Sequence, residues 1–139
     1  MGLGISQYLI VITGCLVLTG CGLFQGSECP AGLGASHVAT LYFGRNIDGR
    51  EGISDSDWQN FAAREIAPRF GSGYTVSDAT GQWRGVSGQV IAERTKMVTI
   101  VLSGASDEGA QINALRDAYK SHFHQESVLL VENKACTGF

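Results

Sequence analysis

The first 27 residues of this 139-residue chain contain no charged side chain. All ten lysines and arginines and all thirteen aspartates and glutamates lie from Glu28 onward. The formal net charge of −3 leaves no basic excess, and a protein that binds nucleic acid through its phosphates needs a basic surface. The chain therefore divides into an uncharged leader and one weakly acidic domain, and its composition excludes a general nucleic-acid binder.

The sequence also lacks the common motifs of catalysis and cofactor binding. It has no G-x-S-x-G, no H-E-x-x-H, no P-loop and no G-x-G-x-x-G. His122 and His124 with Glu126 could begin a metal site, but no further histidine or cysteine completes the spacing typical of zinc. We therefore expect no cofactor and no metal, and the sequence favours a protein that is not an enzyme.

The uncharged leader has the form of an export signal. Tyr8–Leu18 is almost wholly apolar, but its eleven residues are too few for a membrane-spanning helix, which needs about 20. Leu18-Thr19-Gly20-Cys21 follows and resembles the lipobox of bacterial lipoproteins. We predict a signal peptide over 1–20, a lipidated cysteine (the palmitate-bearing Cys21) and a short tether over 21–36.

Two alternatives to this interpretation stay open. A second lipobox-like sequence ends at Cys15, with fewer apolar residues before it, and the leader could instead remain as an uncleaved anchor. A lipid on Cys21 would place the protein outside the cytoplasm, anchored in the bacterial cell envelope. In a host with two membranes, Gly22 after Cys21 favours the outer membrane, facing the periplasm.

The four cysteines divide by their positions. Cleavage removes Cys15 and lipidation uses Cys21, so Cys29 and Cys136 remain. Two remaining thiols in an oxidising compartment usually form a disulfide, and we predict that bond here. The alternative is two independent thiols.

The remainder of the chain, residues 37–139, reads as a single α+β domain. A helix begins at Ser54, where Asp57 completes a capping box, and ends at Pro68. A second helix begins at Ser106 or Asp107 and carries one apolar stripe to Phe123. The predicted strands are residues 37–43, 74–84, 89–102 and 128–131.

This β-α-β-β-α-β order predicts a ferredoxin-like sandwich, an antiparallel sheet with two helices on one face. The first strand would pair with the last, which brings Cys29 and Cys136 to the same end of the sheet. The aromatic side chains Tyr42, Trp58, Trp83 and Tyr119 are expected in the core.

The same topology predicts a rim of polar side chains at the opposite end. There, Arg84 and Lys120 could hold an anion, while Asp78 or Glu126 orients it or acts as a base. The alternative is that these groups form surface pairs and stabilise a helix C-terminus. The predicted rim consists of Arg45, Asp78, Gln82, Arg84, Lys120, His122 and Glu126.

The apolar strands raise the question of what covers the second face of the sheet. Residues 128–131 are all apolar, and only Thr99 interrupts residues 97–102. Strands that are apolar on both faces need cover on both. A second copy of the chain or another envelope protein could supply it, and the alternative is cover by loops and the N-terminal segment.

Four segments of the domain resemble one known family. They are LYFGR (Leu41–Arg45), DWQNFAAREIAPRF (Asp57–Phe70), GYTVSDATGQWRG (Gly73–Gly85) and AYKSHFHQESVLLVENKAC (Ala118–Cys136). Together they are similar to a family of small exported bacterial lipoproteins catalogued as domain of unknown function 3574, over residues 37–139. The resemblance implies a compact α+β domain and carries no activity.

The sequence thus predicts a lipid-anchored envelope protein whose disulfide-closed domain serves binding or structure. The membrane, through Cys21, is its expected partner, with a homodimer or another envelope protein as a further partner and no nucleic acid. The alternative is a small ferredoxin-like enzyme or ligand carrier that uses Asp78, Arg84 and Glu126 or a cavity in a dimer.

Overall fold

The structure is a computed structural model that describes residues 29–139. The predictions for the signal peptide, Cys15 and Cys21 lie outside the described residues. The elements are β1 (Gly34–Gly44), β2 (Asn46–Ile47), β3 (Arg50–Glu51), α1 (Asp55–Phe61) with a π-helical continuation (Ala62–Ile66), β4 (Thr75–Arg84), β5 (Val90–Leu102), α2 (Glu108–Phe123) and β6 (Leu129–Thr137).

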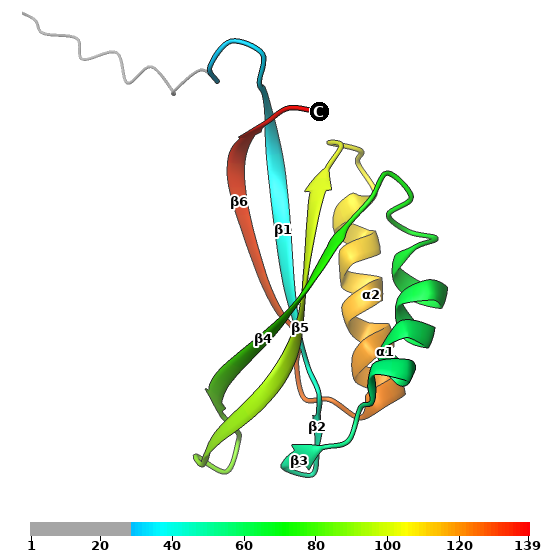
Figure 1. Cartoon of the computed structure of the whole chain (residues 1–139), viewed down its shortest axis with the longest axis vertical. Helices are drawn as coiled ribbons and strands as arrows, with labels where there is room; N and C mark the ends of the chain where they lie inside the picture. The colour runs from blue at the N-terminus through cyan, green and yellow to red at the C-terminus, as the bar shows by residue number, and fades with distance from the viewer. Residues whose placement is uncertain (1–28) are drawn as a thin grey trace, which may run out of the picture.

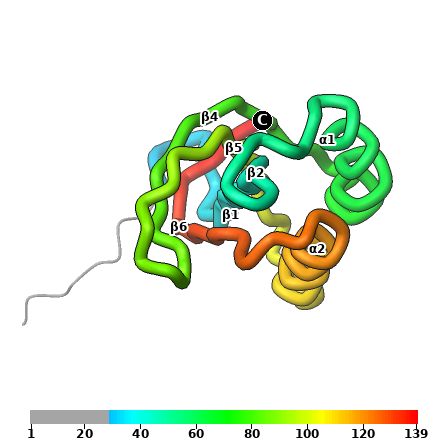
Figure 2. Tube along the Cα trace, turned by 90° about the horizontal axis from the view of Figure 1, so that it is seen from below, coloured from blue at the N-terminus to red at the C-terminus, as the bar shows by residue number. Residues whose placement is uncertain are grey.

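Four long strands form one antiparallel sheet in the order β4-β5-β1-β6. Both long helices lie on one face of this sheet (Figure 1). Seen from the end that carries β2, the helices lie together on one side and the curved sheet on the other (Figure 2). The expected α+β class, four-stranded antiparallel sheet and two helices on one face are therefore confirmed.

The core lies between the sheet and the helices. Alternate residues of β1, namely Ala39, Leu41 and Phe43, are fully buried there. The Phe43 ring lies 5.2 Å from the Trp58 ring of α1 and 4.8 Å from the Tyr119 ring of α2, centroid to centroid. These aromatic contacts join both helices to the central strand. The capping box of Ser54 and Asp57 is present at the start of α1, as predicted.

The second face of the sheet carries no helix among the described residues. The alternate side chains of β1 and β6, such as Tyr42 and Leu129, face this side. Leu129 is 58% exposed and Val131 is 36% exposed. Residues 29–139 alone therefore leave this face partly open.

β1 begins at Gly34, earlier than predicted, and two further differences concern β6 and the loop after β1. β6 continues to Thr137, because the polar residues 132–134 still pair with β1. Polar side chains are tolerated in this part of the strand, since they are exposed to solvent. The loop after β1 contains a two-stranded hairpin, β2 and β3, that the sequence analysis missed. Asp48 and Gly49 form its turn with positive φ angles of 51° and 77°, as an Asp-Gly hairpin turn requires.

The predicted disulfide between Cys29 and Cys136 is confirmed. It joins the segment before β1 to the end of β6, beside the Ala35–Cys136 pair of the sheet, with 5.5 Å between the two Cα atoms. A disulfide of this kind is compatible with an exported protein. In the described part of the chain, no helix is both long enough and apolar enough to cross a membrane.

Removing the disulfide is expected to destabilise the domain. The bond closes a loop between positions 107 apart, and the chain-entropy model assigns about 4–5 kcal/mol to such a loop. The Cys29→Ser, Cys136→Ser double variant should lose about that much free energy of unfolding in urea titrations. Reducing the unaltered protein should reproduce the loss. An unchanged urea midpoint, with both thiols freely labelled before reduction, would contradict the bond.

Candidate ligand-binding pocket

The structure divides the predicted rim among separate places. Arg45 is only 2% exposed, and its Nε donates a hydrogen bond to the Ile53 carbonyl at 2.8 Å. Its guanidinium also lies 3.2 Å from Glu51 and 3.2 Å from Asp55. Arg45 therefore joins the end of β1 to β3 and to the start of α1.

Asp78 reaches the same cluster through a lysine. Lys96 Nζ lies 2.6 Å from Asp78 and 2.9 Å from Asp55, so the lysine connects β4 to α1. Hydrogen bonds to both carboxylates raise the pKa of Lys96. The hydrogen bond from Lys96, together with the charge of Arg45, lowers the pKa of Asp55. We call Arg45, Glu51, Asp55, Asp78 and Lys96 the charge cluster.

The charge cluster has the character of a structural network. Its two buried cations, Arg45 and Lys96, each contact two carboxylates. Buried charges require such partners, and removing one of them would leave the other uncompensated. The cations of this cluster therefore do not form an open anion site.

Three further rim residues lie elsewhere. Arg84 donates a hydrogen bond to the Gly88 carbonyl within the β4–β5 hairpin, whereas Lys120 pairs with Asp117 on α2 at 2.7 Å. The His122 ring lies against Phe123, with the centroids 4.5 Å apart. Arg84 and Lys120 thus have separate partners on separate elements. In residues 29–139, no three side chains of the metal-binding types gather closely enough to hold a metal ion.

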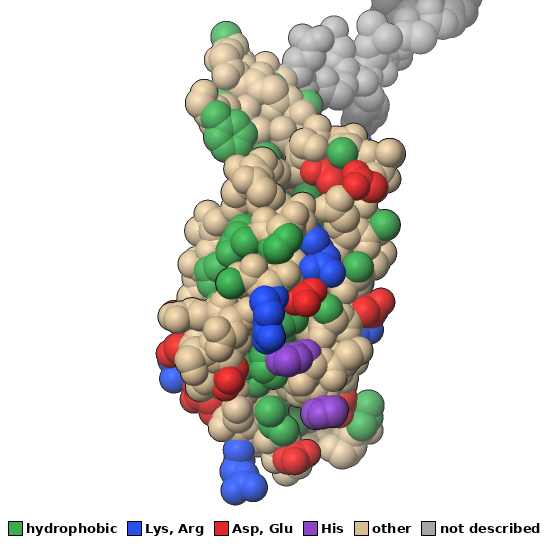
Figure 3. Space-filling view, turned by 90° about the vertical axis from the view of Figure 1, so that its right-hand side faces the viewer, with side chains coloured by type: hydrophobic (Ala, Val, Ile, Leu, Met, Phe, Trp, Pro, Cys, Tyr) green, Lys and Arg blue, Asp and Glu red, His purple; other side chains and the backbone are tan. Residues whose placement is uncertain are grey.

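Figure 3 shows the side of the molecule on which the helices lie. Basic, acidic, histidine and apolar side chains are interspersed there, and no single type dominates the surface. A shallow hollow between the helices includes Phe61, Arg64 and His122. The mixture is typical of an ordinary solvated helix face.

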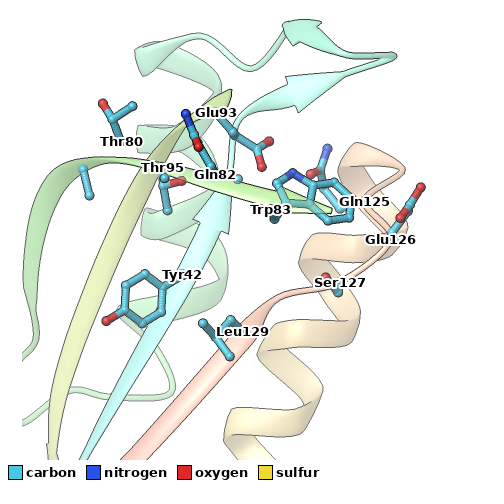
Figure 4. Close-up of a pocket in the computed structure, with 13 residues that line it drawn as sticks. Tyr42, Thr80, Gln82, Trp83, Glu93, Thr95, Gln125, Glu126, Ser127 and Leu129 are labelled. Carbon is cyan, nitrogen blue, oxygen red and sulfur yellow. The ribbon is translucent and has the colours of Figure 1, made fainter. Parts of the chain in front are cut away.

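The last two rim residues, Gln82 and Glu126, line a pocket with a volume of about 230 Å³. The pocket is formed by the end of β1, the β4–β5 hairpin and the loop between α2 and β6 (Figure 4). It opens on the sheet face that the helices leave uncovered, at the end far from the disulfide. The other labelled lining residues are Tyr42, Thr80, Trp83, Glu93, Thr95, Gln125, Ser127 and Leu129.

Glu93 is the half-buried carboxylate of this pocket. Its Oε1 accepts a hydrogen bond from the Asn46 backbone nitrogen at 2.7 Å. Burial raises the pKa of Glu93, and the hydrogen bond from Asn46 and the neighbouring indole N–H of Trp83 oppose the shift. Gly44 makes room for the carboxyl group, because a Cβ at that position would approach it to 2.5 Å.

Trp83 places an indole N–H beside this carboxylate. Its Nε1 is buried and makes no well-aligned hydrogen bond within residues 29–139, although it lies close enough to Glu93 to lower the pKa of that carboxyl. In Figure 4 the indole nitrogen points toward the Glu93 side chain, while the carboxylate of Glu126 points outward. A buried donor without a partner is costly and uncommon in folded proteins. Such a group in a pocket marks a place where a ligand can form the missing interaction.

Gln125 holds in place the pocket wall that the loop between α2 and β6 forms. Its Nε2 donates hydrogen bonds to the Asn46 carbonyl at 2.7 Å and to the Phe123 carbonyl at 3.2 Å. These bonds hold the loop before β6 against β2. The wall is therefore positioned before any ligand binds.

The sequence analysis missed most of this pocket. Trp58 and Tyr119 are in the core as expected, but Trp83 and Tyr42 line the pocket, so their assignment to the core was wrong. Glu93 was not considered at all. Strand alternation could have found it, because Trp83 and Glu93 fall on the same face when β4 and β5 pair as a hairpin.

Comparison with protein families identifies one that covers the domain. A family model described as a protein of unknown function, DUF3574, matches residues 38–139. No curated protein is significantly similar to the chain.

Several solved structures are similar in fold. A phage SAM lyase in complex with S-methyl-5'-thioadenosine is 20% identical, with a TM-score of 0.58, and the match covers 82% of this chain and 95% of the lyase. The apo state of a phage SAM lyase is 21% identical, also with a TM-score of 0.58, over 80% of this chain and 90% of the lyase. CutA from Synechococcus elongatus is 10% identical with a TM-score of 0.46, over 74% and 83% of the two chains. At these identities the likeness concerns the fold alone.

Replacing Glu93 by glutamine should increase stability at neutral pH. The folded-state pKa of Glu93 is raised, so ionising this carboxyl costs stability as the pH rises through that pKa. Glutamine stays neutral and can still accept the hydrogen bond from Asn46. In urea titrations at about pH 7, the free energy of unfolding of the Glu93→Gln variant should exceed that of the parent. Below about pH 4 the two free energies should be equal. A variant less stable than the parent at both values would contradict this account of Glu93.

Proposed function

The chain belongs to the DUF3574 family, and from that premise we propose that it is an exported, lipid-anchored module that binds a small molecule in the pocket. One observation carries the proposal: the buried indole N–H of Trp83 lies beside the half-buried carboxylate of Glu93 without a well-aligned hydrogen bond, at the wall of a pocket. Two polar groups that remain incompletely paired at the wall of a cavity are a standing cost to the folded domain. A ligand that binds them would offset this cost.

The pocket suits a small ligand. Pockets for drug-sized molecules run from roughly 300 to 1,000 Å³, and this one is about 230 Å³. Tyr42, Trp83 and Leu129 offer apolar surface, and the neighbouring amide and hydroxyl side chains offer hydrogen bonds. A few polar groups on a largely apolar wall are the usual composition of a ligand site.

A lipid anchor at Cys21 would orient the pocket. The tether from Cys21 to Cys29 can span under about 30 Å, which holds the disulfide end of the domain close to the membrane. The pocket lies at the other end of β1 and β6, so it would face away from the lipid surface. The strand order β4-β5-β1-β6 also supports a ferredoxin-like assignment of the fold.

A small enzyme that uses the same pocket is the second candidate. A half-buried carboxylate with a raised pKa, as in Glu93, is a suitable general base. It would replace Asp78 in that role, because Asp78 is already paired with Lys96. Conversion of a bound ligand to a product would favour this candidate over simple binding.

Filling the pocket should abolish binding without unfolding the domain. Gly81 pairs with Glu93 across the hairpin, and a Cβ on Gly81 would meet no atom within 4 Å. The Gly81→Leu variant should therefore place its side chain in the pocket and fold normally. Gly34→Leu is the matched control, because Gly34 is also a strand glycine with open space, at the far end of the sheet.

The readout is the Trp83 indole N–H resonance, assigned with a Trp83→Phe variant. The probes are S-methyl-5'-thioadenosine, which a structural neighbour binds, and benzylamine, benzyl alcohol and benzoate. We expect at least one probe to shift this resonance in the parent and in Gly34→Leu, but not in Gly81→Leu. If no probe shifts it, or if Gly81→Leu responds as the parent does, the proposed pocket function is wrong.

The anchor is tested separately in cells. We expect the unaltered chain to enter the membrane fraction and to incorporate labelled palmitate. The Cys21→Ala variant should lose both properties, because no thiol would be available at the predicted site. Cys15→Ala is the control and should keep both. Loss of the label in Cys15→Ala, with retention in Cys21→Ala, would assign the lipid to the other cysteine.

A further inference from the structure

The charges that line the pocket all have one sign. Glu93 and Glu126 are acidic, and none of the residues that line the pocket is a lysine, arginine or histidine. The other lining residues are neutral. An anionic ligand would meet two carboxylates and no counter-charge, so the lining disfavours it.

The basic residues of β5 are turned away from the pocket. Arg94 and Lys96 alternate with Glu93 along the strand and lie on its other face. Both are already paired, Arg94 with Glu51 at 3.3 Å and Lys96 with Asp55 and Asp78. No cation of β5 therefore neutralises the pocket face of Glu93.

The Glu93 carboxylate is only partly paired. The Asn46 backbone nitrogen donates to Oε1 at 2.7 Å, and the Trp83 indole N–H lies close to the carboxylate without a well-aligned hydrogen bond. An ionised carboxylate can accept several hydrogen bonds, and its bonds are strongest with charged donors. A donor that also carries positive charge is the group that best completes this site.

An aromatic surface lies beside the carboxylate. Figure 4 shows the Trp83 indole next to Glu93, with Tyr42 and Leu129 along the adjoining wall. Cations bind favourably over aromatic faces, with tryptophan the best of them. The apolar part of the same ligand can pack against Leu129.

We propose that the pocket binds a small organic ammonium ion, whose N–H groups donate to Glu93 while its apolar part packs against Trp83. This inference rests on the proposed ligand-binding function and specifies the chemistry of its ligand. It requires both charge and N–H donors on the ligand, and it predicts weak binding of neutral or anionic molecules with the same apolar group.

The test uses three probes that share a phenyl ring and differ in charge. Benzylamine is cationic, benzyl alcohol is neutral and benzoate is anionic at about pH 7. Titrations that follow the Trp83 indole N–H resonance should give benzylamine the highest affinity. We expect benzyl alcohol to bind at least about tenfold more weakly, the difference that one hydrogen bond to a charged group provides. Benzoate should bind more weakly still.

Two variants test how much the charge of the Glu93 carboxylate contributes to binding. Glu93→Gln keeps the shape and removes the charge, so it should reduce the affinity for benzylamine at least about tenfold and leave benzyl alcohol nearly unchanged. Glu132→Gln is the matched control, because Glu132 is an exposed glutamate of β6 that does not line the pocket. It should bind all three probes as the unaltered protein does.

The possible outcomes separate this inference from the proposed function. If the three probes bind the unaltered protein equally, or if benzoate binds best, the pocket binds ligands but the ammonium inference is wrong. If S-methyl-5'-thioadenosine and all three phenyl probes leave the Trp83 resonance unmoved, the proposed function itself fails. The comparison of probes needs no variant, so a folding defect in Glu93→Gln would not obscure the result.

Discussion

The alternation of side chains along β1 and β5 is the constraint on which the rest of this structure depends. Odd and even positions of a strand face opposite sides, and helices cover only one side of this sheet. Leu41 and Phe43 therefore enter the core, while Tyr42 between them faces the pocket. On β5 the same alternation places Lys96 in the charge cluster on one face and Glu93 in the pocket on the other. One sheet thus separates a structural network of charges from a site with ligand-binding character.

The disulfide and the pocket lie at opposite ends of the domain. The Cys29–Cys136 bond closes the end where β1 begins and β6 finishes. The pocket end instead retains a poorly aligned indole N–H at Trp83 and a half-buried carboxylate at Glu93. Such groups destabilise a fold unless packing elsewhere compensates. The aromatic core around Phe43 and the disulfide provide that compensation, which allows the pocket to remain incompletely paired.

The sequence was sufficient for features that depend on local patterns and on position along the chain. The capping box at Ser54, the order of the long strands and the pairing of Cys29 with Cys136 all follow from such patterns. The polar rim required more, because the end of the sheet at which a residue lies does not state which partners its side chain meets there. Arg45 illustrates the difference: it lies at the expected end, but Glu51 and Asp55 bury it in a network. Glu51 reaches it through the β2–β3 hairpin, which the sequence did not predict.

The fold alone leaves the chemistry of the domain undetermined. The phage SAM lyase shares the fold at 20% identity, and one fold can carry unrelated functions at different places. The chemistry of this chain must therefore be inferred from its own side chains. Glu93 and Trp83 both come from the β4–β5 hairpin, so one local element supplies the charge and the aromatic surface. Gln125 and Asn46 hold the facing loop in place. The rigid sheet and that loop hold these groups in fixed positions, an arrangement that would reduce the entropic cost of binding the proposed ligand.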